Sequence, residues 1–325
     1  MRVPVARSKA EMARARKGRS VDGILVLDKP AGPTSNQALQ RVKWLFDAAK
    51  AGHTGSLDPL ATGVLPICFG EATKFTQFLL EADKTYASTF RLGVTTTTGD
   101  QDGDVLAEKS AASVSAAQIE AALTAFRGSI EQIPSMYSAL KQGGQPLYKL
   151  ARQGLEVERA PRQVIIHSYA IDAFRSGECA ELDVVIRCSK GTYIRTLAED
   201  LGRQLGCGAH VTRLRRLASG PFGEADAVTL DDIDALRTSG SFAALDTLLR
   251  PVDAAVADRL ALELPENLSW YFLRGQAVAL AQARQEASEG DLVRVFRAPG
   301  EFLGVGEVLD DGRIKPHRLV AGAQR

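Results

Sequence analysis

One stretch of twelve residues, 52–63, with the sequence GHTGSLDPLATG, limits what this chain can fold into more than any other. Its three glycines permit left-handed turns and close approach of the backbone. Asp58 stands directly before Pro59, which pushes the Asp58 backbone out of the helical region toward extended geometry. The stretch therefore predicts a shaped loop, and loops on a rigid scaffold often carry function. Asp58 in this loop is either an acceptor of backbone hydrogen bonds in a turn or a catalytic carboxylate.

Composition narrows the class of protein. The chain has 325 residues, of which 45% are hydrophobic, and this suits one large domain together with a small one. The net charge is only +1, so a nucleic-acid partner has to be met by a local basic surface. No apolar run reaches the length of a membrane span, and the N-terminus lacks the apolar core of a signal peptide. We therefore expect a cytoplasmic protein with no membrane association.

Metal sites are not expected from the sequence. Three acids, Asp100, Asp102 and Asp104, alternate like the ligands of a calcium loop, but the glycine stands at the wrong position and no Glu follows at the twelfth. We interpret them as an acidic turn between strands. The cysteines show no C-x-x-C spacing and no neighbouring His at ligand spacing, which argues against zinc. They are Cys68, Cys179, Cys188 and Cys207.

Residues 1–20 form a basic stretch, with seven Lys and Arg residues against the single acid Glu11. Such a stretch is either a solvated flexible tail or an electrostatic arm that binds RNA phosphates. The sequence leaves both interpretations open.

Local patterns predict the elements that flank the loop. Residues 24–27 form a short apolar strand, and Thr34 then has the position of a helix N-cap with Gln37 as its capping-box partner. Residues 84–94 alternate as a strand, which places Tyr86 on one face and its neighbours on the other. Tyr86 on such a strand is either an ordinary strand aromatic or a residue that faces a ligand.

Residues 132–160 interleave aromatic and basic side chains around a Gly-Gly turn. Tyr137 and Lys141 precede the turn, and Tyr148 and Arg152 follow it. Aromatic rings that stack on bases and cations that meet phosphates are what recognition of single-stranded RNA requires. The same composition also fits a surface hairpin and helix with ordinary solvated charges.

Arg195 occupies an unusual position for a cation. A strand over residues 182–188 and a short turn lead into a helix whose first turn contains Arg195. A positive charge there opposes the helix dipole, at a cost of a few tenths of a kcal/mol to about 1 kcal/mol. Arg195 is either an accident of a solvated surface or a charge held for a partner carboxylate. A basic run follows at 208–217 (GAHVTRLRRL), and its apolar positions indicate a packed segment.

These stretches together resemble the motifs of a known family, the TruB-type tRNA pseudouridine synthases. The resemblance rests on the loop at 52–63, on KTY at 84–86, on KGTYIR at 190–195 and on the run at 208–217. It covers roughly residues 22–250 and weakly the remainder. One departure is Ser56, where many members of the family carry Thr or Ala, at a position without an assigned chemical role.

The resemblance implies a role for each candidate site residue. Asp58 is expected to be the catalytic residue, Arg195 its ion-pair partner, and Tyr86 the ring that packs on the target base and takes part in proton transfer. The resemblance also implies six substrate-binding residues, in the base pocket, in the place that the flipped base vacates and in the RNA-gripping segment. They are His53, Tyr193, Leu214, Lys141, Tyr137 and Arg152.

The implied fold is α+β, with a mixed, largely antiparallel sheet in the catalytic domain and a small β-rich PUA-like C-terminal domain. We expect a basic tail over 1–20, the catalytic domain over 21–250 with a thumb insertion at about 132–160, and the PUA-like RNA-binding domain over 251–325. The implied reaction converts uridine to pseudouridine at position 55 in the T-arm loop of tRNA, by base flipping and without a cofactor or metal. We expect a monomer with no obligate protein partner.

Two other functions fit parts of the sequence. A non-catalytic RNA chaperone would remodel tRNA through the same surface but would leave no pseudouridine behind. An Asp-dependent hydrolase of nucleosides or glycosides usually needs a second carboxylate near the first, and the matched motifs offer only one acid. Product analysis after incubation with tRNA separates these functions.

Overall fold

The computed structural model describes residues 18–138 and 140–321 of the chain, without the side chain of Lys141. Most of the basic stretch 1–20 lies outside these residues. The predicted tail or RNA-binding arm therefore falls outside the described part of the chain. Arg19, near the end of that stretch, forms an ion pair with Asp246 at 2.6 Å and donates from Nε to the Phe46 carbonyl at 2.9 Å. This residue is therefore held against the body of the protein.

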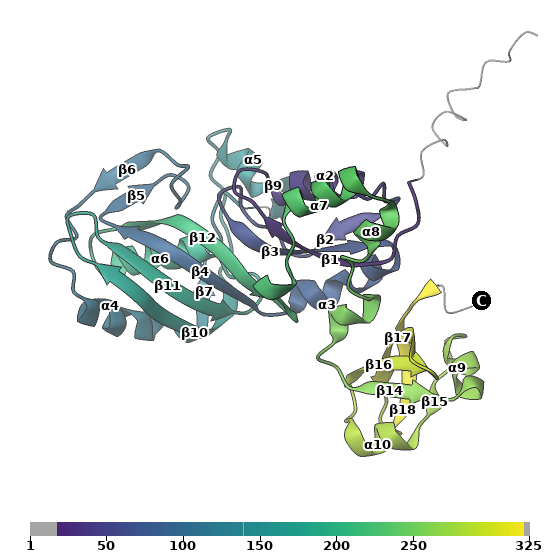
Figure 1. The fold of residues 1–325 in the computed structure, drawn as a ribbon. Helices are drawn as coiled ribbons and strands as arrows, with labels where there is room; N and C mark the ends of the chain where they lie inside the picture. Colours follow the sequence, from purple (N-terminus) through teal and green to yellow (C-terminus); the bar gives the residue numbers. More distant parts are fainter. Residues whose placement is uncertain (1–17, 139, 322–325) are drawn as a thin grey trace, which may run out of the picture.

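A nine-stranded sheet forms the larger part of the molecule (Figure 1). Its main path runs β1–β3–β12–β4–β11–β10–β7, with β2 paired to β3 and β13 paired to β12. Among the described strands of this sheet, only β12 and β3 pair in parallel, so the predicted α+β fold with a largely antiparallel sheet is confirmed. The strands are β1 (Gly23–Lys29), β2 (Ala51–His53), β3 (Thr62–Phe69), β4 (Lys84–Leu92), β7 (Gly128–Gln132), β10 (Arg162–Arg175), β11 (Glu181–Cys188), β12 (Ala209–Ser219) and β13 (Phe222–Gly223).

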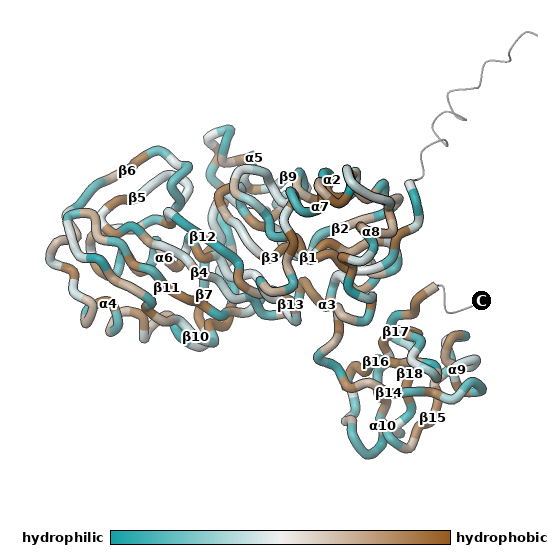
Figure 2. The backbone as a smooth tube through the Cα atoms, in the orientation of Figure 1, coloured by the Kyte–Doolittle hydropathy of each residue, from teal (hydrophilic) through white to brown (hydrophobic). Residues whose placement is uncertain are grey.

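Helices and 3-10 turns bury the apolar side chains of this sheet, on both faces at β1, where Leu25 and Ile24 belong to different apolar clusters. Thr34 caps the first of them through the predicted capping box, in which its side chain accepts from the Gln37 amide. One apolar cluster joins strand residues such as Leu25 and Phe90 to helix residues such as Leu197, and in Figure 2 strand β1 and its surroundings are mostly brown. The helices are α2 (Ser35–Leu45), α3 (Thr76–Glu81), α4 (Ala116–Leu123), α6 (Ile194–Gln204), α7 (Leu230–Ser239) and α8 (Phe242–Asp246), with short 3-10 turns η1 (Gly70–Phe75), η2 (Thr124–Phe126), η3 (Glu224–Asp226) and η4 (Val252–Val256).

Gly63, at the start of β3, fixes how closely the central loop approaches the sheet. Its φ is +99°, and a Cβ atom at this position would overlap the backbone of Arg216 on β12. Gly63→Ala should therefore lower the free energy of unfolding by about 2 kcal/mol or more, because positive φ alone costs an L-residue roughly 1–2 kcal/mol. Urea denaturation of the purified variant measures this loss.

Gly52 is the matched control for that substitution. It lies in the same stretch, has no positive φ, and a Cβ atom there would meet nothing within 4 Å. Gly52→Ala should change the free energy of unfolding by less than about 0.5 kcal/mol, as surface substitutions usually do. Equal losses in the two variants would show that the close approach at Gly63 does not matter.

The segment between β7 and β10 leaves the sheet and returns to it at the same place, since Arg162 pairs with Gln132. It carries a small hairpin of β8 (Lys141–Gln142) and β9 (Gln145–Pro146), followed by α5 (Leu147–Ala151). A hairpin and helix are what the sequence pattern indicated. The further assignment of this segment as an RNA-gripping thumb stays a prediction.

A separate five-stranded sheet follows near the C-terminus, in the order β14–β16–β17–β18–β15, and Figure 1 shows it as a smaller lobe. It has its own apolar cluster, as a β-rich module requires. Before it, the η4 residues Ala255 and Val256 join a cluster that contains Ile24 and Phe75 of the larger lobe. The boundary at 250/251 stays a prediction. The elements of this lobe are β14 (Ala261–Leu264), α9 (Glu266–Phe272), β15 (Val278–Ala279), α10 (Ala281–Glu286), β16 (Leu292–Arg297), β17 (Glu301–Val308) and β18 (Arg313–Leu319).

Candidate active site

The loop that carries Asp58 joins β2 to β3 and is anchored on both sides of this residue. On one side, Ser35 Oγ donates to the Leu57 carbonyl at 3.0 Å and accepts from the Leu57 amide at 2.7 Å. On the other side, the buried Lys29 Nζ donates to the carbonyls of Pro59 at 3.3 Å and Ala61 at 2.7 Å. These contacts satisfy backbone groups that a buried loop would otherwise leave unpaired. Asp58 is therefore presented from a fixed backbone.

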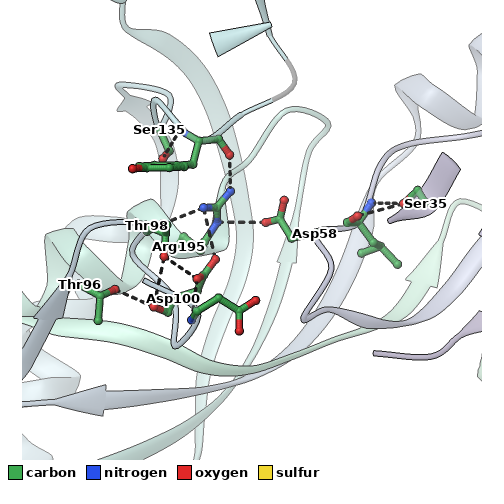
Figure 3. Close-up of polar contacts among 10 residues, drawn as sticks. Ser35, Asp58, Thr96, Thr98, Asp100, Ser135 and Arg195 are labelled. Carbon is green, nitrogen blue, oxygen red and sulfur yellow. Dashed lines mark hydrogen bonds and ion pairs between the residues drawn. The ribbon is translucent and has the colours of Figure 1, made fainter. Parts of the chain in front are cut away.

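Arg195 lies at the centre of a polar network around Asp58 (Figure 3). Its side chain is 4% exposed, and its Nε lies 3.0 Å from Asp58 Oδ2. Its Nη1 donates to the Thr98 carbonyl and its Nη2 to the Tyr137 carbonyl, each at 2.8 Å. The expected contact between Arg195 and Asp58 is confirmed, although these residues lie far apart in the sequence. Their catalytic roles stay predictions.

Asp100 supplies a second carboxylate to Arg195, a contact that the sequence did not predict. The acids at 100–104 do form a turn between two strands, β5 (Val94–Thr96) and β6 (Val105–Glu108). Asp100 is buried in that turn, however, and its Oδ2 lies 3.4 Å from Arg195 Nη1. Thr98 Oγ1 donates to Asp100 Oδ1 at 2.6 Å. No local pattern marks this residue, because its partner comes from another part of the chain.

The electrostatics of Asp58 reflect two opposing influences. Burial raises the pKa of its carboxyl above the ordinary 3.8, and the charge of Arg195 acts in the opposite direction. Nearby Asp100 adds to the increase, and Lys29 works with Arg195 to oppose it. The side chain is nevertheless 38% exposed, toward the cavity in front of it. The carboxylate is thus held by Arg195 and accessible to a ligand.

One cavity brings together the residues expected to hold a base. Tyr86, Tyr193 and Leu214 line it with Asp58 and Arg195. Burial raises the pKa values of both tyrosines, so both phenols are neutral near pH 7. The backbone of Tyr193 is fixed by the side-chain amide of Gln132, which accepts from the Tyr193 amide at 3.0 Å and donates to its carbonyl at 3.2 Å.

A second cavity adjoins the first at Asp58 and Arg195. His53, Tyr137 and Arg152 line it, and the Arg152 guanidinium lies 5.8 Å from the centre of the Tyr148 ring. His53 is absent from the lining of the base cavity. Burial lowers the pKa of His53, and its Nδ1 is buried without a hydrogen-bond partner in the described part of the chain. The side chain of Lys141, which we also expected to bind the substrate, is not among the described side chains.

Comparison with known proteins identifies the family. The model of the TruB family pseudouridylate synthase N-terminal domain matches residues 43–194, and two TruB C-terminal models match residues 195–257 and 261–320. The chain belongs to the TruB family of pseudouridylate synthases. The family to which the sequence motifs pointed is therefore confirmed, and with it the prediction that the protein is an enzyme.

Individual relatives agree with this assignment. The chain is 54% identical to the tRNA pseudouridine synthase B of Saccharophagus degradans, over 95% of this chain and 98% of that one. It is 56% identical to the protein of the same name from Ectopseudomonas mendocina, over 96% of this chain and 98% of that one. Among solved structures, a chain in the crystal structure of a Cbf5–Nop10–Gar1 complex matches with a TM-score of 0.67 and 26% identity, over 93% of this chain and 80% of that one.

Within residues 18–138 and 140–321, no three His, Cys, Asp or Glu side chains are grouped so that they could hold a metal ion. Over the same residues, no helix combines the length and the apolar character needed to cross a membrane.

Proposed function

We propose that this chain converts uridine to pseudouridine at position 55 in the T-arm loop of tRNA. The observation that carries the proposal is the Asp58–Arg195 pair, whose carboxylate is accessible from a cavity lined by aromatic and apolar side chains. The names of the relatives, tRNA pseudouridine synthase B, support tRNA as the substrate. The enzyme acts in the cytoplasm as a monomer.

In the proposed reaction the bond between C1′ and N1 of the uridine breaks, the base turns within the cavity, and C5 bonds to C1′ in place of N1. Asp58 acts at the ribose, as a nucleophile toward carbon or as a base toward a ribose proton. Arg195 keeps this carboxylate ionised and oriented, opposing the effect of burial. Tyr86 packs on the base and takes part in moving its proton. The atoms balance as an isomerisation, and the reaction needs no cofactor.

Access to the uridine requires that it leave the stack of bases in the T-arm loop. We assign to the neutral His53 the place that the flipped base vacates, since His53 lies beside the second cavity, next to Asp58. Tyr193 and Leu214 hold the flipped base. Tyr137, Lys141 and Arg152 bind the flanking RNA from the thumb.

The direct test is product analysis. We expect incubation with an unmodified tRNA transcript, followed by mapping at nucleotide resolution, to give pseudouridine at position 55. Pseudouridine at another position would contradict the proposed specificity. Remodelled tRNA without pseudouridine would favour a chaperone, and release of free uracil would favour a hydrolase.

Arg152 tests whether the thumb contributes binding rather than chemistry. Arg152→Ala should weaken tRNA affinity about threefold to tenfold at moderate salt, because one cation that meets a phosphate is lost. The rate at saturating enzyme in a single turnover should stay within about twofold of wild type, since a uniform loss of binding leaves kcat unchanged. Filter binding and single-turnover kinetics measure the two quantities.

Arg175→Ala is the matched control, because Arg175 pairs with Asp183 and Glu181 at the far end of β10 and lines neither cavity. This variant loses the same charge and should keep its tRNA affinity. If both variants weaken binding equally, the effect comes from net charge alone and the thumb has no special part in it.

A further inference from the structure

Two buried cations lie behind the base cavity, and the proposed mechanism gives them no part. Lys84 on β4 and Arg216 on β12 are 6% and 1% exposed, and both line the cavity with Tyr86 and Asp58. Tyr86 pairs directly with Arg216 across the two strands, and Lys84 lies two residues before Tyr86, on the same face of the sheet. The sheet therefore presents both positive charges toward the place where the base is expected.

Both cations are held in fixed positions by backbone carbonyl groups. Arg216 donates from Nε to Val64 at 2.7 Å and from Nη2 to Gly55 at 3.2 Å. Lys84 donates from Nζ to the carbonyls of Leu79, Leu80 and Ala82, at 3.1, 2.8 and 2.6 Å. The Asp58 loop crosses over them, since a Cβ atom on Gly55 would lie 3.5 Å from Arg216 Nη1 and 3.9 Å from Lys84 Cε.

Neither cation forms an ion pair with an acid in the described part of the chain. Arg195 has two carboxylate partners, Asp58 and Asp100, but across the described residues no carboxylate lies within 4.0 Å of Lys84 or Arg216. Burial, together with repulsion from Arg216, lowers the pKa of Lys84 to about 8. An uncompensated buried charge is costly for the fold. Two of them beside one cavity indicate that the compensating negative charge arrives with the substrate.

We propose that Lys84 and Arg216 stabilise the negative charge that uracil acquires when its bond to C1′ breaks. This inference rests on the proposed function. When the C1′–N1 bond breaks, the electron pair stays on N1 and spreads over O2 and O4 of the ring. The charge is consumed when C5 bonds to C1′. C5 then loses its proton and N1 gains one, so the product is an isomer of the substrate. Charges already fixed by carbonyl groups need no rearrangement as the anion forms, which is what makes such stabilisation effective.

Arg216 also acts on Tyr86, the ring expected to contact the base. Burial raises the pKa of the Tyr86 phenol, whereas the charge of Arg216 and its hydrogen bond to the phenol lower it. The field of Arg216 thus favours negative charge at Tyr86 and on the base in front of it. Because Arg216 acts through space and through Tyr86, and Lys84 acts through space, we regard both as positioning residues for charge.

The test varies the stability of the departing anion. Fluorine at C5 withdraws electrons and stabilises the anion, so tRNA carrying 5-fluorouridine at position 55 depends less on the protein for this step. We expect Arg216→Gln to slow consumption of the uridine substrate by about 100-fold or more, the scale seen when one preorganised donor is removed. The same variant should slow consumption of the 5-fluorouridine substrate much less. Single-turnover loss of the N1-linked nucleoside, measured by mass spectrometry after digestion, gives both rates.

Lys29→Met is the matched control for loss of a buried cation. Lys29 is also buried and donates to three carbonyls, of Pro30, Pro59 and Ala61, but it does not line the base cavity. Lys29→Met should slow the uridine and 5-fluorouridine substrates by the same factor. Lys84→Met should behave as Arg216→Gln does. Arg216→Lys keeps the charge, so it should slow the uridine substrate less than Arg216→Gln does.

The outcomes separate the inference from the proposed function. Equal slowing of both substrates in Arg216→Gln and Lys84→Met, in proteins that still bind tRNA, would overturn the inference while wild type still forms pseudouridine. If Arg216→Gln does not fold, the comparison rests on Lys84→Met, and equal slowing of both substrates by that variant also overturns the inference. Failure of wild type to form pseudouridine at position 55 would instead overturn the proposed function.

Discussion

Asp58→Asn should abolish pseudouridine formation and leave tRNA binding nearly unchanged. The amide fills the same space in a loop held by Ser35 and Lys29, so the backbone and the cavity should persist. What the variant loses is the negative charge that faces the cavity. We expect the single-turnover rate to fall by more than about 100-fold, the lower range for loss of a general acid–base group. Mapping of pseudouridine over time at saturating enzyme measures the rate.

Asp102→Asn is the matched control for this substitution. Asp102 is exposed and lines the adjoining cavity, but no ion pair links it to Arg195 in the described structure. It should keep close to the wild-type rate. A rate for Asp58→Asn within tenfold of that of Asp102→Asn would remove Asp58 from the chemistry.

The acid limb of the pH profile gives a second test of Asp58. Activity needs the ionised carboxylate, so the rate should fall as pH drops through the pKa of Asp58. Because burial raises this pKa above 3.8, the fall should begin at a higher pH than for an ordinary aspartate. A wild-type rate that stays constant down to pH 4 would contradict this assignment.

Arg195→Met should have the second large effect on catalysis. The substitution removes the cation that, among the described residues, contacts both Asp58, at 3.0 Å, and Asp100, at 3.4 Å. Two neighbouring carboxylates are then left without their partner, and breaking a buried ion pair from one side costs about 3–5 kcal/mol. The pKa of Asp58 should rise further, since burial already raises it and the main opposing influence is gone. If this whole cost falls on the reaction barrier, we expect a rate reduced by roughly 150-fold to 5,000-fold at pH 7, at about 1.36 kcal/mol per factor of ten.

Arg195→Lys should recover only part of that loss. Lysine keeps the charge, but it has no planar fork to reach Asp58, Thr98 and Tyr137 at once, as the guanidinium does. Raising the pH should restore activity to Arg195→Met more than to wild type, if the defect lies in protonation of Asp58. Full activity in Arg195→Lys would show that a point charge is sufficient and that the three-way geometry is unimportant.

The sequence predicted the elements that follow local rules. The capping box of Thr34 and Gln37 starts a helix where it was expected, because both partners lie within one turn of chain. The alternation of residues 84–94 predicted strand β4 (Lys84–Leu92). It also placed Tyr86 on the face that carries the buried Phe90. The motif resemblance added the expectation that Asp58 and Arg195 meet, which no local pattern supplies, and the structure brings them together.

The residues that the sequence reading missed all owe their importance to distant partners. Asp100 appeared to be one acid of a surface turn, and only the fold brings it to Arg195. Arg216 appeared to be one basic residue in a run, although its alternation with Leu214 would have placed both on one face had the run been read as a strand. Lys84 gave no sign that its ammonium group would be buried.

The sequence by itself therefore determined the family, the elements near each motif and the identity of the central carboxylate, because these depend on residues close together in the chain. Apart from the pair of Asp58 and Arg195, the tertiary structure decided which charges neutralise one another. Arg195 contacts two carboxylates, whereas in the described structure Lys84 and Arg216 are held by carbonyl groups and form no ion pair with a carboxylate. This distribution depends on the register of β4 against β12 and on the path of the loop above them. Charges interact through space, so their balance is fixed only when the chain has folded.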